Sequence, residues 1–469
     1  MTDILRPEVK RFPPGERLPS SRALVERFGA SPITVSRALA ALAAEGLVVT
    51  RPGAGTFRAA PAPGGDARPA DTSWQQLALS AEEHGGGPPR SVDAAGVLAS
   101  LTTPPPGVIA LNAGYLHATL QPEQALGAAL SRAARRPGAW DKPPVEGLTA
   151  LRGWFAREAG GSVGPADVLI TAGGQAALTT ALHALAAPGS PVLVESPGYP
   201  GALAIARAAG LRPVPVPMDG DGVRTDLLAD AFAATGARVL VCQPLFQNPT
   251  GTVLGAERRR QVLELARAAG AFVIEDDFAR RLGHGGPLPA PLVAEDRDGT
   301  VVHVTSLTKP TSPSLRVGAL IARGPVLERL RAIQVVDTFF VPRPLQEAAL
   351  ELVGAPAWPR HLRAVAAGLR ERSGAMLAAL GEHLPQLLPE HVPAGGYQLW
   401  LRLPHGTDEA ALTAAALRQG VAIAPGHAYF AAEAPGPHVR LSFANASGPA
   451  ELTEGVRRLA AAIAETGGI

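Results

Sequence analysis

The sequence predicts an α/β protein, in which a mostly parallel β-sheet with helices on both faces follows a small winged helix-turn-helix. Three observations support this fold class. Residues 18–58 have the pattern of two short helices and a hairpin, residues 59–106 are rich in proline and glycine, and from about residue 107 short apolar runs alternate with helical stretches rich in alanine, leucine and arginine. Such alternation is typical of a parallel sheet covered on both sides. A chain of 469 residues is long enough for two or more domains.

The first unit begins with two helices separated by a tight turn. Ser20-Ser21-Arg22 opens a helix that runs to Phe28 and ends at Gly29, and a serine is well placed as its N-cap. Ser31-Pro32 starts the second helix, because proline is tolerated in a first turn. The residues compatible with its buried face are Ile33, Val35, Leu39 and Leu42.

A two-stranded hairpin completes this unit as a winged helix-turn-helix. Apolar residues 47–50 are followed by a glycine-rich turn at 51–55 and by Thr56-Phe57. We therefore expect a DNA-binding domain over residues 1–58. Only Met1 to Phe12 precede Pro13-Pro14-Gly15, so the first helix is expected to be cut short, which suggests a misassigned start codon.

The rest of the chain is expected to divide into a linker, 59–106, and a body, 107–469. The body should have a large part over roughly 107–330 and a smaller C-terminal αβ part over roughly 331–469. Five apolar runs in the large part are predicted to be buried strands: 168–171, 192–195, 239–241, 272–275 and 301–304.

Charge and cysteine content favour some classes of protein over others. Residues 1–60 contain nine Lys/Arg and five Asp/Glu, which gives +4, and the whole chain carries +2, which leaves −2 for the remainder. A basic head on a faintly acidic body favours a nucleic-acid-binding module. The single cysteine, Cys242, excludes an intrachain disulfide framework and fits a reducing compartment. Since no apolar run approaches a membrane span and Met1-Thr2-Asp3 lacks the start of a secretory signal, we expect a cytoplasmic protein.

One lysine stands in a chemically suggestive context. The chain contains three lysines, and Lys309 lies in Ser306-Leu307-Thr308-Lys309. An amine can form a Schiff base with an aldehyde, whereas a guanidinium cannot, so a lysine retained in an arginine-rich chain has a chemical use that arginine could not fill. A solvated surface lysine is the alternative.

Polar residues follow the predicted strands where an α/β sheet binds its ligand. Residues 171–175 lead from a strand into a helix, whose free N–H groups suit a phosphate. Tyr199 follows the next strand and could stack on a flat ring. Asp276 ends a later strand and could form a salt bridge with a pyridinium nitrogen. Each also has an ordinary structural alternative, as a turn, an aromatic lid or a helix cap.

Three further residues complete this pattern. Ser306 and Arg316 flank Lys309 and could hold a phosphate. Arg440 could bind a substrate carboxylate in a bidentate manner, although a lone arginine beside a strand usually forms a structural salt bridge. We expect recognition of a substrate side chain to depend on loops around residues 112–120 and 425–432.

From about residue 107 to the end, these motifs resemble, in order and spacing, those of the fold-type I pyridoxal 5'-phosphate enzymes of the class I/II aminotransferase group. The resemblance implies pyridoxal phosphate as cofactor, with Lys309 as the Schiff-base lysine and Asp276 as the partner of the pyridine nitrogen. Tyr199 would stack on the ring, and Asn248 would bond to its phenolic oxygen. The remaining implied residues are Gly174, Gln175, Ser306 and Arg316 for the phosphate and Arg440 for a carboxylate.

Residues 18–58 resemble a GntR-type winged helix through 18–22 and 31–37. A head of this kind fused to an aminotransferase-like body is typical of the MocR-type regulators. The resemblance implies a double-stranded DNA operator, with the second helix in the major groove. The implied DNA-binding residues are Arg22, Ser31, Thr34, Ser36, Arg37, Gly53 and Gly55.

Two departures from the family pattern concern the cofactor site. Many relatives have a tyrosine two or three residues after the aspartate, but Phe278 and Ala279 offer no phenol there. We expect Asn248 to compensate. A tyrosine that reaches the partner subunit's phosphate also lacks a match, since Trp140 and Lys142 stand in that region.

Three functions fit these features. The first is a homodimeric transcription factor that senses pyridoxal phosphate or an amino compound. The second is an active aminotransferase with a tethered DNA-binding head, and the third is a degenerate body that serves only as a dimerisation scaffold. Joint retention of Lys309, Asp276, Arg316 and Arg440 argues against the third. We expect no membrane and no metal as partners.

Overall fold

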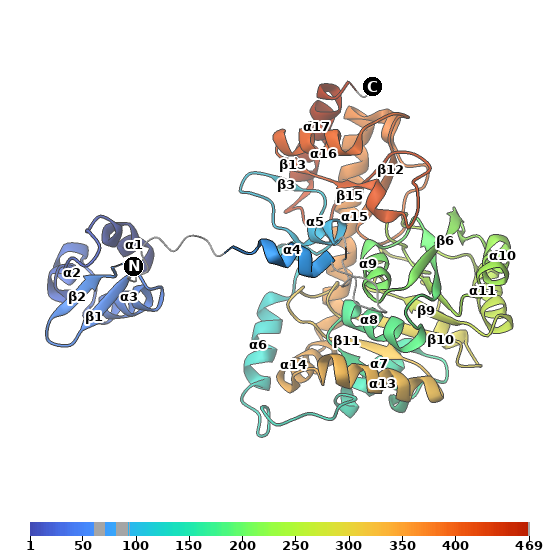
Figure 1. Cartoon of the computed structure of the whole chain (residues 1–469), viewed down its shortest axis with the longest axis horizontal. Coiled ribbons are helices and arrows are strands. Elements are labelled where there is room, and N and C mark those ends of the chain that lie inside the picture. Colours follow the sequence, from blue (N-terminus) through green and yellow to red (C-terminus); the bar gives the residue numbers. More distant parts are fainter. Residues whose placement is uncertain (61–70, 81–91, 93, 468–469) are drawn as a thin grey trace. The chain divides into compact units, whose positions relative to one another are not determined.

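The computed structural model describes residues 1–60, 71–80, 92 and 94–467. The chain divides into two compact units, Met1–Pro89 and Arg90–Ile469, and Figure 1 labels their helices and strands.

The first unit is a winged helix-turn-helix, as the sequence predicts. Its helices are α1 (Thr2–Lys10), α2 (Ser21–Phe28) and α3 (Pro32–Ala44), and β1 (Val48–Arg51) pairs antiparallel with β2 (Gly55–Arg58). Ser20 and Ser31 cap α2 and α3, since their hydroxyl oxygens accept the N–H groups of Ala23 and Thr34, each at 3.2 Å.

One apolar core holds the three helices and the hairpin together. The short α1 takes part in it, because its buried Leu5 and Val9 pack with residues of α2, α3 and β1. Ile33 does not belong to this core, and its side chain is 68% exposed. It lies two residues before buried Val35, about 200° away around the helix, so the predicted buried face was wrong at this position. The core consists of Leu5, Val9, Leu18, Leu24, Val35, Ala38, Leu39, Leu42 and Val48.

The predicted linker contains two helices, α4 (Ser73–Ser80) and α5 (Ala95–Leu101). Helix α5 belongs to the second unit, where it contacts α9 (Pro200–Ala208). It is anchored by the Asn112 side chain, whose Nδ2 donates to the carbonyl oxygen of Ala99 at 2.7 Å.

The second unit is built on an eight-stranded sheet with the order β4-β11-β10-β9-β8-β5-β6-β7. Its five central strands run parallel, and β11, β4 and β7 pair antiparallel with their neighbours. The strands are β4 (Val168–Thr171), β5 (Pro191–Ser196), β6 (Arg212–Asp219), β7 (Gly222–Val223), β8 (Val239–Cys242), β9 (Phe272–Asp276), β10 (Val301–Ser306) and β11 (Gly318–Ile321).

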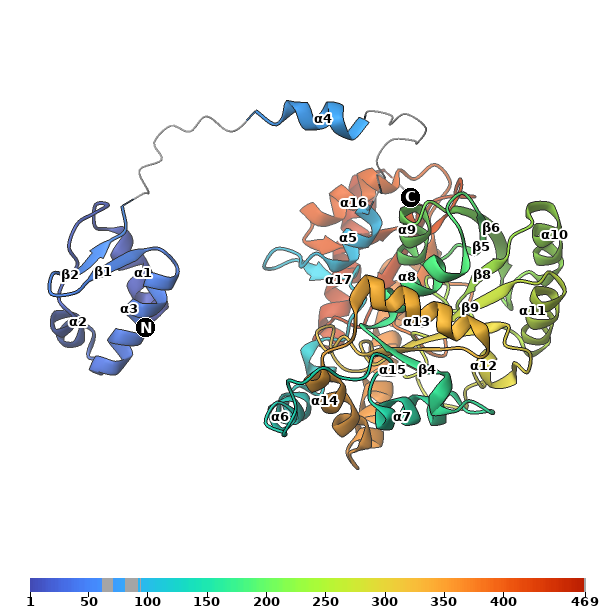
Figure 2. The same cartoon turned by 60° about the horizontal axis from the view of Figure 1, so that its bottom comes forward.

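Both faces of this sheet are buried, because successive side chains of a strand point to opposite sides. In β8, for example, Val239 and Val241 belong to one core while Leu240 and Cys242 belong to the other. The first core is covered by α8 (Gly174–Leu185), α9 and α13 (Pro325–Thr338). The second is covered by α7 (Thr149–Ala159), α10 (Thr225–Thr235), α11 (Ala256–Ala268), α12 (Leu292–Glu295) and α14 (Arg343–Gly354). Figure 2 shows α10 and α11 side by side at one edge of this unit.

The C-terminal part has its own small sheet, in the order β12-β15-β14. The start of the body also packs with this C-terminal part, because β3 (Ile109–Ala110) pairs parallel with β13 (Val421–Ala422) in a separate two-stranded sheet. The two strands are close in Figure 1. Helix α15 (Trp358–His383) runs from the core of the large sheet to that of the small part. The other elements are α6 (Glu123–Ala133), β12 (Gln398–Arg402), α16 (Glu409–Arg418), β14 (Ala424–Pro425), β15 (His438–Ser442) and α17 (Pro449–Glu465).

None of the helices in the described residues is both long and apolar enough to cross a membrane.

The turn that carries Asn248 depends on a glycine. Gly251 has a φ of 75°, and a Cβ added there would lie 2.3 Å from Cγ of Pro393. Gly160 has the same φ of 75° but nothing within 4 Å of an added Cβ. We expect Gly251→Ala to lower the free energy of unfolding by about 1–3 kcal/mol more than Gly160→Ala, because only the first adds a steric overlap to the backbone strain. Denaturant unfolding of both full-length variants measures the difference, and equal losses would show that Pro393 accommodates the methyl group.

Candidate functional site

A cavity of about 340 Å³ lies at the carboxyl ends of the central strands. Ligands of open α/β sheets bind at this edge. The cavity brings together side chains that are far apart in the sequence, from the large sheet, from β15 of the small part and from α5. Each residue predicted for the cofactor or carboxylate lines it: Gly174, Gln175, Tyr199, Asn248, Asp276, Ser306, Lys309, Arg316 and Arg440.

Lys309 points its amino group into this cavity. Its Nζ donates to the carbonyl oxygen of Gly114 at 2.6 Å and lies 4.3 Å from the ring centroid of Tyr115. Burial lowers the pKa of Lys309 to about 8, and the nearby Arg440 and Arg316 act in the same direction. A larger fraction of the amine is therefore neutral and nucleophilic near pH 7 than for an exposed lysine.

Asp276 is the one carboxylate that lines the cavity among the described residues. Asp276 is the last residue of β9. Because successive side chains of a strand point to opposite faces, its neighbours Glu275 and Asp277 point away from the cavity. Burial raises the pKa of Asp276 to about 6, while a hydrogen bond from Gln243 Nε2 to its Oδ2, at 2.6 Å, opposes that rise. A cationic ring nitrogen beside it would favour the charged carboxylate.

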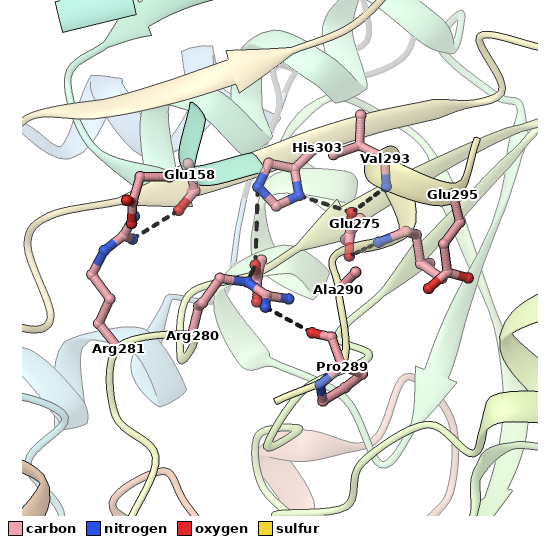
Figure 3. Close-up of polar contacts among 12 residues, drawn as sticks. Glu158, Glu275, Arg280, Arg281, Pro289, Ala290, Val293, Glu295 and His303 are labelled. Carbon is pink, nitrogen blue, oxygen red and sulfur yellow. Dashed lines mark hydrogen bonds and ion pairs between the residues drawn. The ribbon is translucent and has the colours of Figure 1, made fainter. Parts of the chain in front are cut away.

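Glu275 and Asp277 are buried, and Figure 3 shows Glu275 with its neighbours His303 and Val293. Oε2 of Glu275 lies 2.8 Å from Nδ1 of His303, and its two oxygens accept the N–H groups of Leu292 and Val293. Asp277 forms an ion pair with Arg280. These contacts satisfy Glu275 and hold the end of β9 in place.

Gly174 and Gln175, two of the predicted phosphate ligands, are the first two residues of α8, and the other two, Ser306 and Arg316, lie close to them. A Cβ built on Gly174 would be 3.8 Å from Cβ of Ser306, and one built on Gly173 would be 3.0 Å from Cζ of Arg316. Arg316 Nη2 donates to the carbonyl oxygen of Ala172 at 2.9 Å. The helix start, a hydroxyl and a guanidinium thus converge, which suits an anion.

Arg440 enters the cavity from β15 of the small part. The residue is 2% exposed, Nη1 lies 3.4 Å from Oδ1 of Asn248, and Nη2 donates to the carbonyl oxygen of Asn112. Its buried Nε has no hydrogen-bond partner within the described residues. An unpaired buried guanidinium N–H is costly, so this group is suited to an anionic ligand.

Aromatic side chains from other parts of the chain bring further phenols to the site. Tyr115 and Tyr397 both line the cavity, so the absence of a tyrosine after Asp276 does not leave the site without a phenol. The rings of Phe278 and Tyr397 pack edge to face with centroids 6.1 Å apart. Tyr115 lies in one of the two loops expected to contact a substrate, but Tyr397 precedes β12 with no distinguishing signal.

Gln243 and α5 were also missed by the sequence analysis. Gln243 directly follows β8, so the same strand-end rule that indicated Asp276 would have found it. Val97, Ser100 and Leu101 of α5 line the cavity from a segment whose composition indicated a linker.

The predicted DNA-binding residues lie on the surface of the head. Arg22, Ser31, Thr34, Ser36 and Arg37 are exposed, and Gly53 and Gly55 form the turn of the hairpin with φ values of 75° and 114°. Ser31 and Thr34 also bond to each other, with their hydroxyl oxygens 2.8 Å apart.

Comparisons with known proteins agree with both parts of the chain. Residues 108–459 match the model of aminotransferase class I and II, and residues 6–57 match that of the bacterial regulatory proteins of the gntR family. The fold and the cavity therefore define an aminotransferase-like body that follows a regulatory DNA-binding domain in the sequence.

The chain belongs to the class I and II aminotransferase family and has the domain arrangement of the MocR-type, GntR-superfamily regulators. It is 28% identical to the HTH-type transcriptional regulator YdfD of Bacillus subtilis, over 97% of this chain and 93% of that protein. It is 33% identical to the 2-aminoadipate transaminase of Thermus thermophilus, over 76% of this chain and 90% of that one. The crystal structure of LysN, the α-aminoadipate aminotransferase of Thermus thermophilus, has a TM-score of 0.74 and 32% identity, and the match covers 80% of this chain and 96% of that one.

The raised pKa of Asp276 predicts a pH-dependent effect on stability. The pKa is about 6 in the folded protein against 3.8 ordinarily. The stability that protonated Asp276 contributes is therefore fully present below pH 3.8 and is lost as the pH rises through about 6. We expect Asp276→Asn to stabilise the cofactor-free protein by about 3 kcal/mol at about pH 8 and by about half of that at about pH 5.

Urea unfolding at the two pH values measures this difference. Asp298, whose side chain is 46% exposed, supplies the control variant Asp298→Asn, which relieves no comparable burial of charge. If Asp276→Asn raised the free energy of unfolding by the same amount at both pH values, the raised pKa of Asp276 would be contradicted.

Proposed function

We propose that this chain is a DNA-binding transcriptional regulator whose body binds pyridoxal phosphate covalently through Lys309 and senses the cofactor or an amino compound that reacts with it. The observation that carries the proposal is the convergence of Lys309, Asp276, Ser306 and Arg316 in one cavity of a chain with a winged helix-turn-helix. Pyridoxal phosphate is the cofactor of the family to which the body belongs.

The donor set of the cavity fits this cofactor. Lys309 supplies the amine for the aldehyde, and Asp276 supplies the carboxylate for the pyridine nitrogen. Gly174, Gln175, Ser306 and Arg316 would hold the phosphate. Tyr199 would lie against the ring, and its hydroxyl donates to Oε1 of Gln175 at 3.1 Å, which fixes its orientation. When bound, the cofactor supplies an electrophilic carbon that an amino compound can attack.

An amino compound bound in the cavity would lie between the two parts of the body. Lys309 comes from the large part, whereas Arg440 comes from β15 of the small part. A ligand that joins them can bias the arrangement of these parts, which is how a small molecule shifts a conformational equilibrium.

An active aminotransferase is the second candidate function. Arg440, with its buried unpaired Nε, is suited to a substrate carboxylate, and a 33% identical relative is named as a transaminase. The crystal structure of LysN is described as a complex with N-(5'-phosphopyridoxyl)-L-leucine, so that relative accommodates an amino-acid adduct of the cofactor. Sustained transamination by this chain would favour this second function.

The regulator is further proposed to be a homodimer, as is typical of this family. The body has large apolar side chains on its surface, including Trp140, Val336 and Phe339, which are 80%, 81% and 69% exposed. Exposed apolar side chains of this size favour an interface with a second copy.

The covalent role of Lys309 can be tested by absorption. Lys309→Arg retains the positive charge but cannot form the bond to the aldehyde, so we expect the purified variant to lose the visible band of lysine-bound pyridoxal phosphate while it still binds DNA. Lys142→Arg is the control and should keep the band. A band that persists in Lys309→Arg would refute the assignment.

DNA binding can be tested on the exposed face of α3. We expect Arg37→Ala to weaken binding to a duplex selected from a random pool by about tenfold or more, since a good base or phosphate contact contributes about 1–3 kcal/mol. Arg457, 58% exposed on α17, provides the control Arg457→Ala, which should leave the affinity unchanged. Fluorescence anisotropy measures both, and equal affinities of wild type and Arg37→Ala would remove Arg37 from the interface.

A further inference from the structure

Helix α5 forms one wall of the cavity that contains Lys309. Val97, Ser100 and Leu101 of this helix line the cavity together with the sheet residues. The helix is packed closely on the body, because a Cβ added to Gly96 would lie 3.0 Å from Cβ of Ala428 and 3.8 Å from that of Pro200. The wall is therefore part of the site even though it lies within the segment that the sequence predicted to be a linker.

The charges of the cavity limit the ligand that this wall meets. Four charged side chains of the described residues line the cavity, namely Asp276, Lys309, Arg316 and Arg440. The first three are assigned to the cofactor, which leaves Arg440 to complement the charge of an amino compound. Its unpaired buried Nε matches one carboxylate. A second charge on the ligand would find no opposite charge among these lining residues, and an unpaired charge is costly to bury.

The α5 wall is apolar in character. Val97 and Leu101 of α5, Leu178 of α8 and Phe278 line the cavity. Leu101 is 55% exposed, so a ligand that packs against it removes apolar surface from water. The charged end of a ligand side chain is not stabilised by such a surface.

Asn112 connects this wall to the carboxylate-binding arginine. Its backbone carbonyl accepts from Nη2 of Arg440, and its Nδ2 donates to the carbonyl oxygen of Ala99 in α5 at 2.7 Å. One residue, Asn112, is thus hydrogen-bonded to both Arg440 and α5. A ligand that contacts both would fix α5, which lies between the head and β3 in the sequence.

We propose that the amino compound is an amino acid with a single carboxylate and an uncharged, apolar side chain. Arg440 binds the carboxylate, and the side chain packs against Val97 and Leu101 of α5. This inference rests on the proposed function and specifies its ligand.

The test uses the full-length protein loaded with pyridoxal phosphate. L-Leucine, L-glutamate and L-lysine are titrated separately, and the change in visible absorption is followed at each concentration. We expect L-leucine to reach half of its effect at a concentration at least about tenfold lower than either charged amino acid, because only its side chain can be buried without an unpaired charge.

Variants of α5 locate the contact. Leu101→Ala should raise the half-saturating concentration of L-leucine by about tenfold, through the loss of apolar contact. Leu98→Ala is the matched control, since Leu98 lies on the same helix, is 58% exposed and is not among the residues that line the cavity. Retention of the visible band by both variants shows that each still folds and binds the cofactor.

The outcomes separate this inference from the proposed function. If L-glutamate or L-lysine acts at the same or lower concentration than L-leucine, or if no amino acid changes the band, the ligand class is wrong while the cofactor assignment stands. If Leu101→Ala and Leu98→Ala behave alike, α5 is not the contact. A wild-type protein that shows no band after loading would instead overturn the proposed function.

Discussion

The burial of two opposite charges, Asp276 and Lys309, in one cavity is the constraint on which the body depends. Each charge is disfavoured by burial, which raises the pKa of Asp276 and lowers that of Lys309, and each is partly stabilised by the other. Gln243 adds a hydrogen bond to Asp276, and the carbonyl of Gly114 accepts one from Lys309. Because the two faces of the sheet are filled by apolar cores, the carboxyl ends of its strands are where such polar groups can meet. A ligand with a cationic nitrogen and an aldehyde would offset both burial costs at once.

The cavity is lined in part by the segment of the body that lies nearest in sequence to the head. Its lining comes from the large sheet, from β15 of the small part and from α5, a helix within the predicted linker. Since β3 adds the start of the body to the small part, the chain enters the body beside the elements that carry Arg440. An occupant of the cavity therefore contacts the region through which the head is attached. The coupling needs only that the ligand favour one arrangement of these elements over another.

Much of this arrangement could be predicted from the sequence, because strand ends are local features. Asp276 and Ser306 each stand just after an apolar run, and Lys309 was conspicuous in a chain with three lysines, whereas the role of Asn248 came from the family resemblance. The wing and both caps of the head followed from serine and glycine positions. Tyr397 and Val97 could not be predicted, since long-range packing alone brings them to the cavity. Ile33 was misplaced because an apolar residue at a helix start need not share the stripe of its neighbours, and α5 was hidden by the proline-rich and glycine-rich composition around it.

We propose that occupancy of the cavity changes DNA affinity, and thermodynamic linkage requires any such coupling to be symmetric. The most direct measurement is a pair of equilibrium titrations of the pyridoxal phosphate-loaded protein. One measures the affinity for a selected duplex with and without saturating L-leucine, and the other measures the half-saturating concentration of L-leucine with and without saturating duplex. We predict that both ratios differ from one by the same factor. Ratios of one in both titrations would contradict the coupling, because the head and the body would then act independently.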